Sequence, residues 1–210
     1  MHRFLLLIIC GLFAVGLEAQ EFSMQPIPDS VFLRMQGRSW PGGCSIHRSD
    51  LRYLRLSHFD AEKRVHVGEM VCNKAIANDL LEIFRELYRQ KYPIQRIRLI
   101  DDYEADDERS MRDNNSSCFC YRKVSGTAKL SKHAMGMAVD INTLYNPYVR
   151  TGKNGRRIVE PATAAKYVDR RRSFPYKIVK GDLLYRLFIQ HGFTWGGSWR
   201  TVKDWQNFEK

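Results

Sequence analysis

Residues 131–140 read Ser-Lys-His-Ala-Met-Gly-Met-Ala-Val-Asp, and this stretch joins a long polar segment to a short apolar one. The alternation over 136–141 predicts a strand with apolar side chains on one face and Ala138 and Asp140 on the other. If His133 lies where the chain turns into this strand, its imidazole and the Asp140 carboxylate converge on one divalent cation. Gly136 permits such a close turn.

The alternative for this pair is a surface histidine beside a strand aspartate that forms an ion pair with an arginine. A His-x6-Asp spacing taken alone often arises by chance. Two further segments change the comparison, namely Trp-Gly-Gly-Ser-Trp at 195–199 and Asp-Trp-Gln-Asn-Phe-Glu at 204–209. The preference for a metal site over this alternative comes from what these segments resemble.

Together these segments resemble the D-alanyl-D-alanine carboxypeptidases and dipeptidases, the VanY-like zinc peptidases of bacterial cell-wall metabolism. The pattern of that family is Ser-x-His-x-x-Gly-x-Ala-x-Asp, followed by an acidic residue three positions before a second histidine. The resemblance covers about residues 90–210. It implies that His133 and Asp140 are zinc ligands, and that Asp204 is the catalytic carboxylate that activates water.

The resemblance also implies an arginine, from the segment before the Ser-x-His motif, that stabilises the oxyanion. Arg109, Arg112 and Arg122 are the candidates, and Arg122 is preferred, although a solvated charge is the alternative for each. Ser131 is expected to support the site by hydrogen bonding rather than to act as a nucleophile.

The sequence departs from the family pattern at the third zinc ligand, where Asn207 stands in place of the expected histidine. A carboxamide oxygen is neutral and binds zinc more weakly than an imidazole nitrogen. His191 is the nearest other histidine in sequence, but its spacing in a predicted helix favours a place at the edge of the core. His47, His58 and His66 belong to no recognisable motif.

Two tryptophans near the carboxyl end have two interpretations. In the first, Trp195 and Trp199 line a substrate groove, and the glycines between them allow the substrate to come close to the backbone. In the second, the two side chains pack the final hairpin. Packing suits at least one of them. Trp205 and Phe208 are expected to belong to the core beside Asp204 and Asn207.

Apolar residues at helical spacing predict a helix over 73–91 with Asn73 as its N-cap. They also predict a second helix from Asp182 to His191, which stops at Gly192. Residues 94–100 predict a strand. Residues 101–132 are polar and irregular, and 149–181 are expected to cross the surface, with the run at 170–172 a solvated loop rather than a binding patch.

The composition is that of one globular domain: 44% of the 210 residues are hydrophobic, 12% aromatic and 27% charged. This excludes a disordered, collagenous or coiled-coil protein. A net charge of +11 predicts attraction to polyanions such as wall polymers. For an exported protein, the same charge does not indicate a nucleic-acid partner.

Residues 1–19, with Arg3 before an apolar run, are interpreted as a secretory signal peptide, and Cys10 within that run is not a lipid-attachment site. The run is too short to span a bilayer. After its removal four cysteines remain, with three possible pairings into two disulfides, of which Cys118 to Cys120 is the most strained. A zinc cluster of cysteines is disfavoured by their spacing. The four are Cys44, Cys72, Cys118 and Cys120.

The sequence therefore predicts residues 20–210 as a single exported α+β domain. Its small, mainly antiparallel sheet carries the metal site and has helices packed on one side, as the resemblance to D-Ala-D-Ala carboxypeptidase and Hedgehog-like folds implies. That resemblance also implies one zinc ion per chain, a periplasmic or extracellular location, and hydrolysis of a peptidoglycan stem peptide. Residues 20–90 are expected to shape the substrate groove.

Two other functions remain open in the sequence. A pseudoenzyme with the same fold binds wall peptide or a partner protein without cleaving it, which Asn207 favours and Asp204 disfavours. A basic module that only adheres to anionic wall polymers shows salt-sensitive binding that does not depend on His133.

Overall fold

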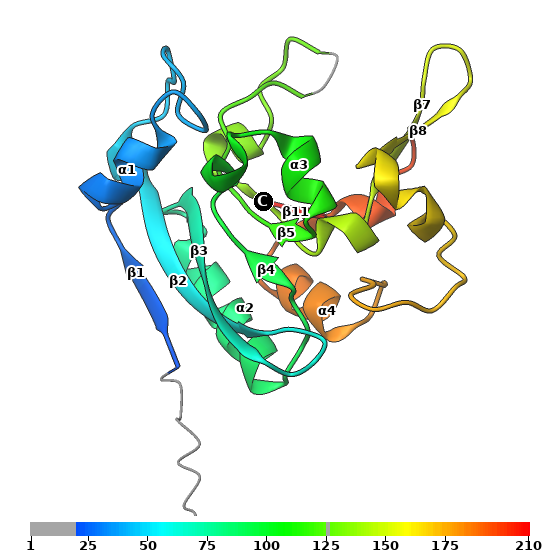
Figure 1. Cartoon of the computed structure of the whole chain (residues 1–210), viewed down its shortest axis with the longest axis horizontal. Coiled ribbons are helices and arrows are strands. Elements are labelled where there is room, and N and C mark those ends of the chain that lie inside the picture. Colours follow the sequence, from blue (N-terminus) through cyan, green and yellow to red (C-terminus); the bar gives the residue numbers. More distant parts are fainter. Residues whose placement is uncertain (1–19, 125–126) are drawn as a thin grey trace, which may run out of the picture.

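A computed structural model describes residues 20–124 and 127–210 of the chain (Figure 1). The proposed signal peptide, Cys10 included, lies outside these residues. The fold is α+β, as predicted. The described residues form three antiparallel sheets of three strands and one parallel pair, rather than the single small sheet that the sequence suggested. Among these residues no helix is both long and apolar enough to cross a membrane.

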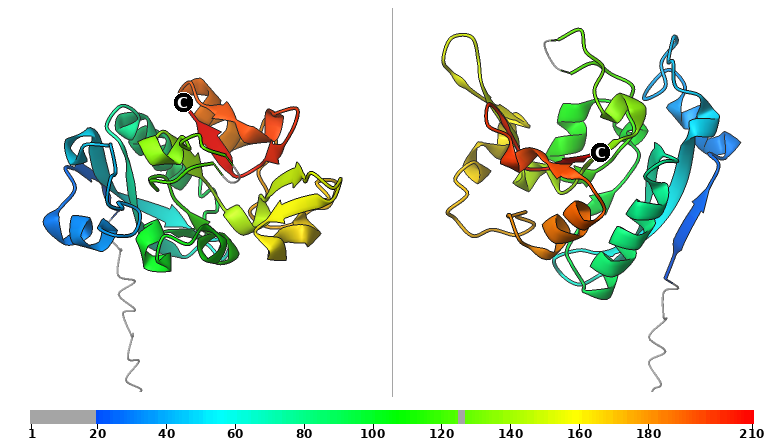
Figure 2. Two further views of the ribbon diagram at one scale, coloured as in Figure 1. Left: turned by 90° about the horizontal axis from the view of Figure 1, so that it is seen from above. Right: turned by 180° about the vertical axis from the view of Figure 1, so that it is seen from behind.

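The amino-terminal half is a sheet covered by one long helix. The sheet has the order β1-β2-β3, and its strands are β1 (Phe22–Gln25), β2 (Leu51–Phe59) and β3 (Val65–Asn73). Helix α2 (Ala77–Arg89) lies along one face of this sheet (Figure 2). The shorter helix α1 (Asp29–Met35) and the 3-10 turn η1 (Arg48–Asp50) lie in the segment between β1 and β2.

Helix α2 begins later than its apolar spacing predicted. Asn73 is the last residue of β3, and its side-chain oxygen accepts a hydrogen bond from the backbone N–H of Ala75. This local turn satisfies the amide before the helix starts, so Asn73 is not the N-cap. The buried face of α2 is as predicted, with Leu80, Phe84 and Leu87 in the largest hydrophobic cluster.

The segment expected to be strand and then irregular loop contains more regular structure than predicted. It holds β4 (Arg96–Ile97), the 3-10 turn η2 (Ile100–Tyr103), α3 (Asp107–Arg112) and β5 (Asn115–Ser116). The Asp106 carboxylate caps α3 by accepting from the N–H of Arg109. A helix of six residues is too short to show apolar periodicity, which explains why the sequence did not reveal it.

The carboxyl-terminal half consists of two small sheets and one helix. The first sheet has the order β6-β11-β9, with β6 (Ala138–Asp140), β11 (Asn207–Glu209) and β9 (Thr194–Trp195). The second has the order β10-β7-β8, with β10 (Lys203–Asp204), β7 (Tyr148–Thr151) and β8 (Arg157–Glu160). In Figure 1 the β7–β8 hairpin projects from the body of the molecule.

Helix α4 (Leu183–Gln190) confirms the prediction for the second helix. The Asp182 carboxylate caps it by accepting from the N–H of Tyr185, and Gly192 follows its end with a φ of +81°. Its Phe188 ring stacks on Phe208 of β11 at 4.4 Å between centroids. Phe188 and α2 side chains share the largest hydrophobic cluster, so one core joins both halves of the chain.

The run at 170–172 is only partly the solvated loop that was expected. Arg170 is half-buried and donates hydrogen bonds to four oxygens, which are the main-chain carbonyls of Tyr145, Tyr167 and Ile178 and the side-chain oxygen of Asn146. Its guanidinium also lies 4.8 Å from the Trp205 ring centre. Desolvation lowers its pKa to about 10. Arg170 therefore fixes this surface segment against the core.

The four described cysteines are free thiols in the structure, so neither of the two possible disulfides is formed. Cys72 and Cys118 are fully buried, and burial raises the pKa of each thiol above its usual value. A buried thiol of this kind is unreactive.

Candidate active site

The turn that brings His133 to the site depends on Gly136. His133 belongs to the 3-10 turn η3 (His133–Met135), and Gly136 ends this turn with a φ of +66°. A Cβ atom at Gly136 would lie 2.7 Å from the backbone nitrogen of Asn73. Only glycine fits here, because both the left-handed backbone and the contact with β3 exclude a side chain.

His133 is buried and held by two polar contacts. Its Nδ1 lies 2.7 Å from the carbonyl oxygen of Cys118, and its Nε2 lies 3.3 Å from Oδ2 of Asp140. A carbonyl oxygen only accepts, so Nδ1 carries a hydrogen and donates it. Burial lowers the pKa of His133, but the Asp140 carboxylate outweighs burial and raises it above the usual value.

Two aspartates and one asparagine face His133 from three strands. Asn207 in β11 pairs directly with Asp140 in β6, whereas Asp204 lies in β10 of the other sheet. Atoms Oδ1 of Asp140 and Oδ1 of Asp204 are buried and have no hydrogen-bond partner among the described residues. Burial raises the pKa of Asp204 well above its usual range, and the nearby Asp140 carboxylate adds to the rise.

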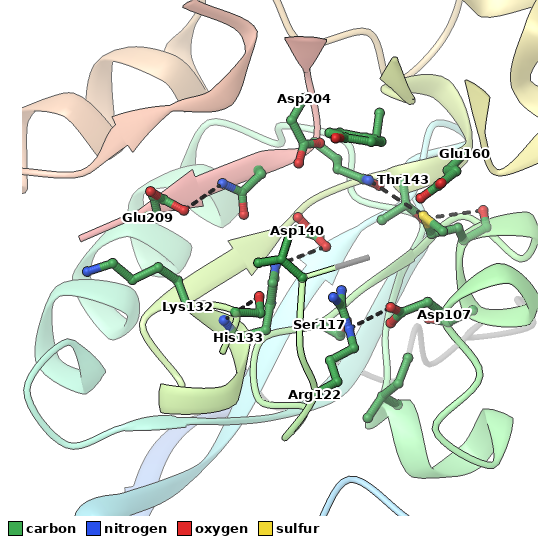
Figure 3. A pocket seen from close by; sticks show the side chains of 18 of the residues that line it. Asp107, Ser117, Arg122, Lys132, His133, Asp140, Thr143, Glu160, Asp204 and Glu209 are labelled. Atoms are coloured by element: carbon green, nitrogen blue, oxygen red, sulfur yellow. Dashed lines mark hydrogen bonds and ion pairs between the residues drawn. The ribbon is translucent and has the colours of Figure 1, made fainter. Parts of the chain in front are cut away.

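These side chains line one cavity of about 370 Å³ (Figure 3). It also receives Ser131, whose hydroxyl accepts from the N–H of His133 at 3.2 Å, as expected of a supporting residue. The cavity lining lies between Ile100 and Glu209 in sequence. The prediction that residues 20–90 shape this groove is therefore wrong. Strand β3 instead contacts the turn that carries His133, because the N–H of Asn73 donates to the carbonyl of Gly136.

Of the three candidate arginines, the structure brings only Arg122 into the cavity. Its Nε lies 2.5 Å from Oδ2 of Asp107, and Figure 3 shows both side chains directed toward each other beside the pocket. Burial raises the pKa of Asp107, although Arg122 opposes that rise. Arg112 instead pairs with Glu108 on α3, and Arg109 lies outside the lining.

The two tryptophans have different environments, and one of them packs in the core, as was predicted for at least one. Trp199 lines the cavity, whereas Trp195 is 7% exposed and belongs to the core, where its indole N–H donates to the carbonyl of Trp205. Trp195 stacks near Phe208, and a Cβ at Gly197 would overlap its ring. Trp195 is thus placed away from a substrate in this cavity.

The remaining histidines lie elsewhere. His191 faces Asp79 at 3.1 Å, at the edge of the core, as its helical spacing predicted. None of His47, His58, His66 and His191 lines the cavity.

The cavity also contains polar residues that sequence reasoning missed. Tyr148, Glu160 and Gln206 line it, together with Glu209 at its other side. Tyr148 pairs with Asp204 on one side and with Glu160 on the other, so the three residues form a row across β10, β7 and β8. This row depends on strand pairing over long sequence separations, and no local motif signals it.

A comparison with protein families bears directly on this cavity. Residues 125–210 match the family model described as D-alanyl-D-alanine carboxypeptidase. The C-terminal part of this chain is therefore similar to the D-alanyl-D-alanine carboxypeptidase family. No curated protein and no solved structure matches the chain.

The carboxypeptidase segment supplies His133, Asp140, Asp204 and Asn207, which all lie within the matched residues. Arg122 and Asp107 precede the matched segment, so residues outside that segment complete the cavity. The expected family is thereby confirmed.

The donor set of this cavity fits a metal ion in part. With Nδ1 donating to Cys118, Nε2 of His133 is available as a ligand, and the unpartnered Oδ1 of Asp140 is a second donor. The third is the carboxamide of Asn207. Among residues 20–124 and 127–210 no three histidines, cysteines or acidic residues are grouped to hold a metal.

Proposed function

We propose that this protein is an exported, zinc-dependent peptidase that hydrolyses a peptide bond in the peptidoglycan stem. The observation that carries the proposal is that His133, Asp140 and Asp204 meet in one cavity. Each aspartate has a buried carboxylate oxygen without a partner among the residues that the structure describes. Their place in a carboxypeptidase segment supports the substrate class.

One zinc ion per chain would be held by His133, Asp140 and Asn207. Bound there, zinc would act as a Lewis acid that polarises the peptide carbonyl and lowers the pKa of water. The carbonyl of Cys118 orients His133 for this role, since it holds the Nδ1 hydrogen and leaves Nε2 toward the ion.

Asp204 would move the proton. As the water oxygen bonds to the carbonyl carbon, the Asp204 carboxylate takes the water's proton and passes it to the nitrogen that leaves when the peptide bond breaks. Burial raises the pKa of Asp204 above its usual range, which favours its holding the proton between the two transfers.

Arg122 would stabilise the negative oxygen that develops during attack. Among the described residues, Arg122 is the arginine that lines the cavity. Its contact with Asp107 holds the guanidinium in place before the substrate binds. Ser131 holds the backbone N–H of His133, and Trp199 offers an aromatic wall to the substrate.

A second function is favoured by Asn207. A protein with this cavity and no bound metal would bind the D-alanine end of a stem peptide, or a partner protein, without cleaving it. Retention of Asp204 at the position for proton transfer supports the peptidase over this binding protein.

Metal content and hydrolysis, measured together, test the proposal. Purified protein spanning residues 20–210 is analysed for zinc and incubated with a stem peptide that ends in D-Ala-D-Ala. About one zinc per chain and release of D-alanine that a chelator abolishes support the peptidase. No zinc and no release, with saturable peptide binding, support the binding protein. His191→Ala, distant from the cavity, is the control and should match the natural protein.

A further inference from the structure

We propose that a basic groove on the reverse face of the β10-β7-β8 sheet binds a single-chain polymer of phosphodiester-linked polyol units. The groove is separate from the cavity that contains His133, and the inference goes beyond the proposed peptidase. It gives the protein a surface that holds an anionic polymer while the cavity remains free for a peptide.

The positive charge of this protein is concentrated in one segment. Residues 149–181 contain ten lysines and arginines but only two acidic residues, which is a net charge of +8 out of +11 for the whole chain. In Figure 1 the β7–β8 hairpin of this segment, drawn in yellow, lies on the side of the molecule away from the β1-β2-β3 sheet. Such a one-sided field attracts polyanions to that side.

Most cations of this segment have no carboxylate partner. Arg150 and Arg171 have a carboxylate within 4.0 Å, from Glu160 and Asp169 respectively. The other eight have none within that distance among the residues that the structure describes. Arg34 of α1, in contrast, contacts two carboxylates. Unpaired cations gathered in one segment repel one another, and a bound polyanion offsets that repulsion.

Side-chain alternation places the groove behind the cavity. Tyr148 of β7 and Asp204 of β10 pair with each other, and both line the cavity. The next pair in the same ladder is Val149 with Lys203, and its side chains leave the opposite face of the sheet. There they line a groove of about 570 Å³ together with Arg157 of β8. The cavity and the groove therefore lie on the two faces of one small sheet.

The groove has cations on two edges and an apolar floor. Lys203 and Arg157 belong to the outer strands β10 and β8, which lie about 10 Å apart because β7 runs between them. The floor is formed by Val149 of β7 and by Val168, which follows the 3-10 helix η5 (Ala162–Tyr167). A chain that crosses this floor can contact cations on either side of it.

The cations of the groove are accessible and mostly uncompensated. Arg157 and Arg171 are exposed and Lys203 is half-buried. The Nζ of Lys203 donates to main-chain carbonyls, including that of Gly197 at 3.3 Å, which positions the ammonium without neutralising it. Asp169 is the acidic residue of the lining, and its Oδ1 lies 2.9 Å from Nε of Arg171. Three cations and one carboxylate leave the lining with a net charge of +2.

The chemistry of the groove favours a phosphodiester chain. A guanidinium binds phosphate through paired hydrogen bonds, and an ammonium binds it as a point charge. The charge of a phosphodiester polymer lies in its backbone, so that one chain can place phosphates at both edges. The carbon atoms between the phosphates then pack on the apolar floor.

A single-stranded nucleic acid is the alternative ligand. Its bases bind by stacking on a succession of aromatic rings. The groove contains one aromatic ring, that of Trp205, which is half-buried and has the guanidinium of Arg170 at 4.8 Å from its centre. A chain without bases therefore fits this groove better.

Poly(glycerol phosphate) is the probe, and calorimetry with the full chain measures its affinity. The double variant Arg157→Gln/Arg171→Gln should bind about tenfold more weakly, as expected for the loss of two phosphate contacts. Added salt should weaken binding of the natural protein more steeply than binding of this variant. The matched control is Arg85→Gln/Arg98→Gln, which removes two exposed arginines outside the groove and should bind as the natural protein does.

Two outcomes would overturn the groove. An equal loss in both double variants would mean that net charge, and not this groove, binds the polymer. Tighter binding of single-stranded DNA than of poly(glycerol phosphate), with the same loss in the groove variant, would assign the groove to nucleic acid instead.

The groove and the peptidase are tested separately. Hydrolysis of a soluble stem peptide should be unchanged in Arg157→Gln/Arg171→Gln, and His133→Ala should keep its affinity for the polymer. Polymer binding without zinc or hydrolysis supports the groove and removes the peptidase. Hydrolysis without polymer binding removes the groove and leaves the peptidase.

Discussion

Asn207 lies directly opposite Asp140 across the β11–β6 ladder. Paired side chains on one face of an antiparallel sheet have Cβ atoms about 5 Å apart, so Asn207 is placed where a third metal ligand would meet the first two. Its amide nitrogen lies 3.4 Å from Oε2 of Glu209, which leaves the amide oxygen for the cavity.

Asn207→His should raise zinc affinity by about a hundredfold, because the free energy of a zinc site, about 10 kcal/mol or more, is shared among roughly four ligands. Any hydrolytic rate should rise with metal occupancy. Zinc titration with a competing chelator measures the affinity. If neither zinc affinity nor rate changes, position 207 does not face the metal.

His133→Ala should abolish zinc binding and hydrolysis, because it removes the only imidazole in the cavity among the described residues. The fold should persist with a loss of about 1–3 kcal/mol in stability, since the buried carbonyl of Cys118 loses its partner. Elemental analysis and a urea titration measure the two effects. Unchanged zinc content would exclude His133 as a ligand.

His58 should make the protein acid-sensitive. It is 3% exposed, and burial lowers its pKa to about 4, with His66 adding to the shift and Asp60 opposing it. The unfolded state takes up the proton near its ordinary pKa of about 6.5, so stability falls as pH drops below 6.5, by about 3 kcal/mol at pH 4. Below that pH the loss from His58 levels off.

Urea titrations at pH 7 and pH 4 measure this effect. His58→Phe should reduce the stability difference between the two pH values by about 3 kcal/mol, while the exposed His47→Gln serves as the control. An equal pH dependence in the natural protein and His58→Phe would contradict the assignment.

Gly136→Ala should destabilise the fold more than a similar change elsewhere. Gly155 also has a positive φ, +75°, but a Cβ there meets nothing within 4 Å. Gly155→Ala should therefore cost about 1 kcal/mol from backbone strain, and Gly136→Ala at least about 2 kcal/mol more, because it also overlaps the Asn73 backbone. Thermal unfolding compares them. Equal losses would mean that the turn tolerates a side chain.

The sequence predicted the parts of this site that depend on local chemistry. The turn at Gly136, the strand that carries Asp140 and the capped helix from Asp182 each follow from a few neighbouring residues, and the structure contains all three. Short α3 was missed because six residues hold no periodic signal.

The other half of the cavity was not predictable in the same way. Glu160 and Asp204 both pair with Tyr148, one from each neighbouring strand, and these strands are far apart in sequence. Arg122 lines the cavity and Arg109 does not, and only the path of the folded chain decides between them. The division of the expected single sheet into separate small sheets likewise depends on long-range pairing. Such contacts are properties of the tertiary fold and leave no local pattern.

Asp204 and Asn207 are only three positions apart, yet they lie in different sheets, and the link between β10 and β11 is Trp205 and Gln206. Asp140 and Asn207, two of the proposed metal ligands, and Asp204, the proposed proton carrier, therefore belong to different sheets. A substitution at 207 therefore alters one of the proposed metal ligands without replacing a residue of the sheet that carries Asp204.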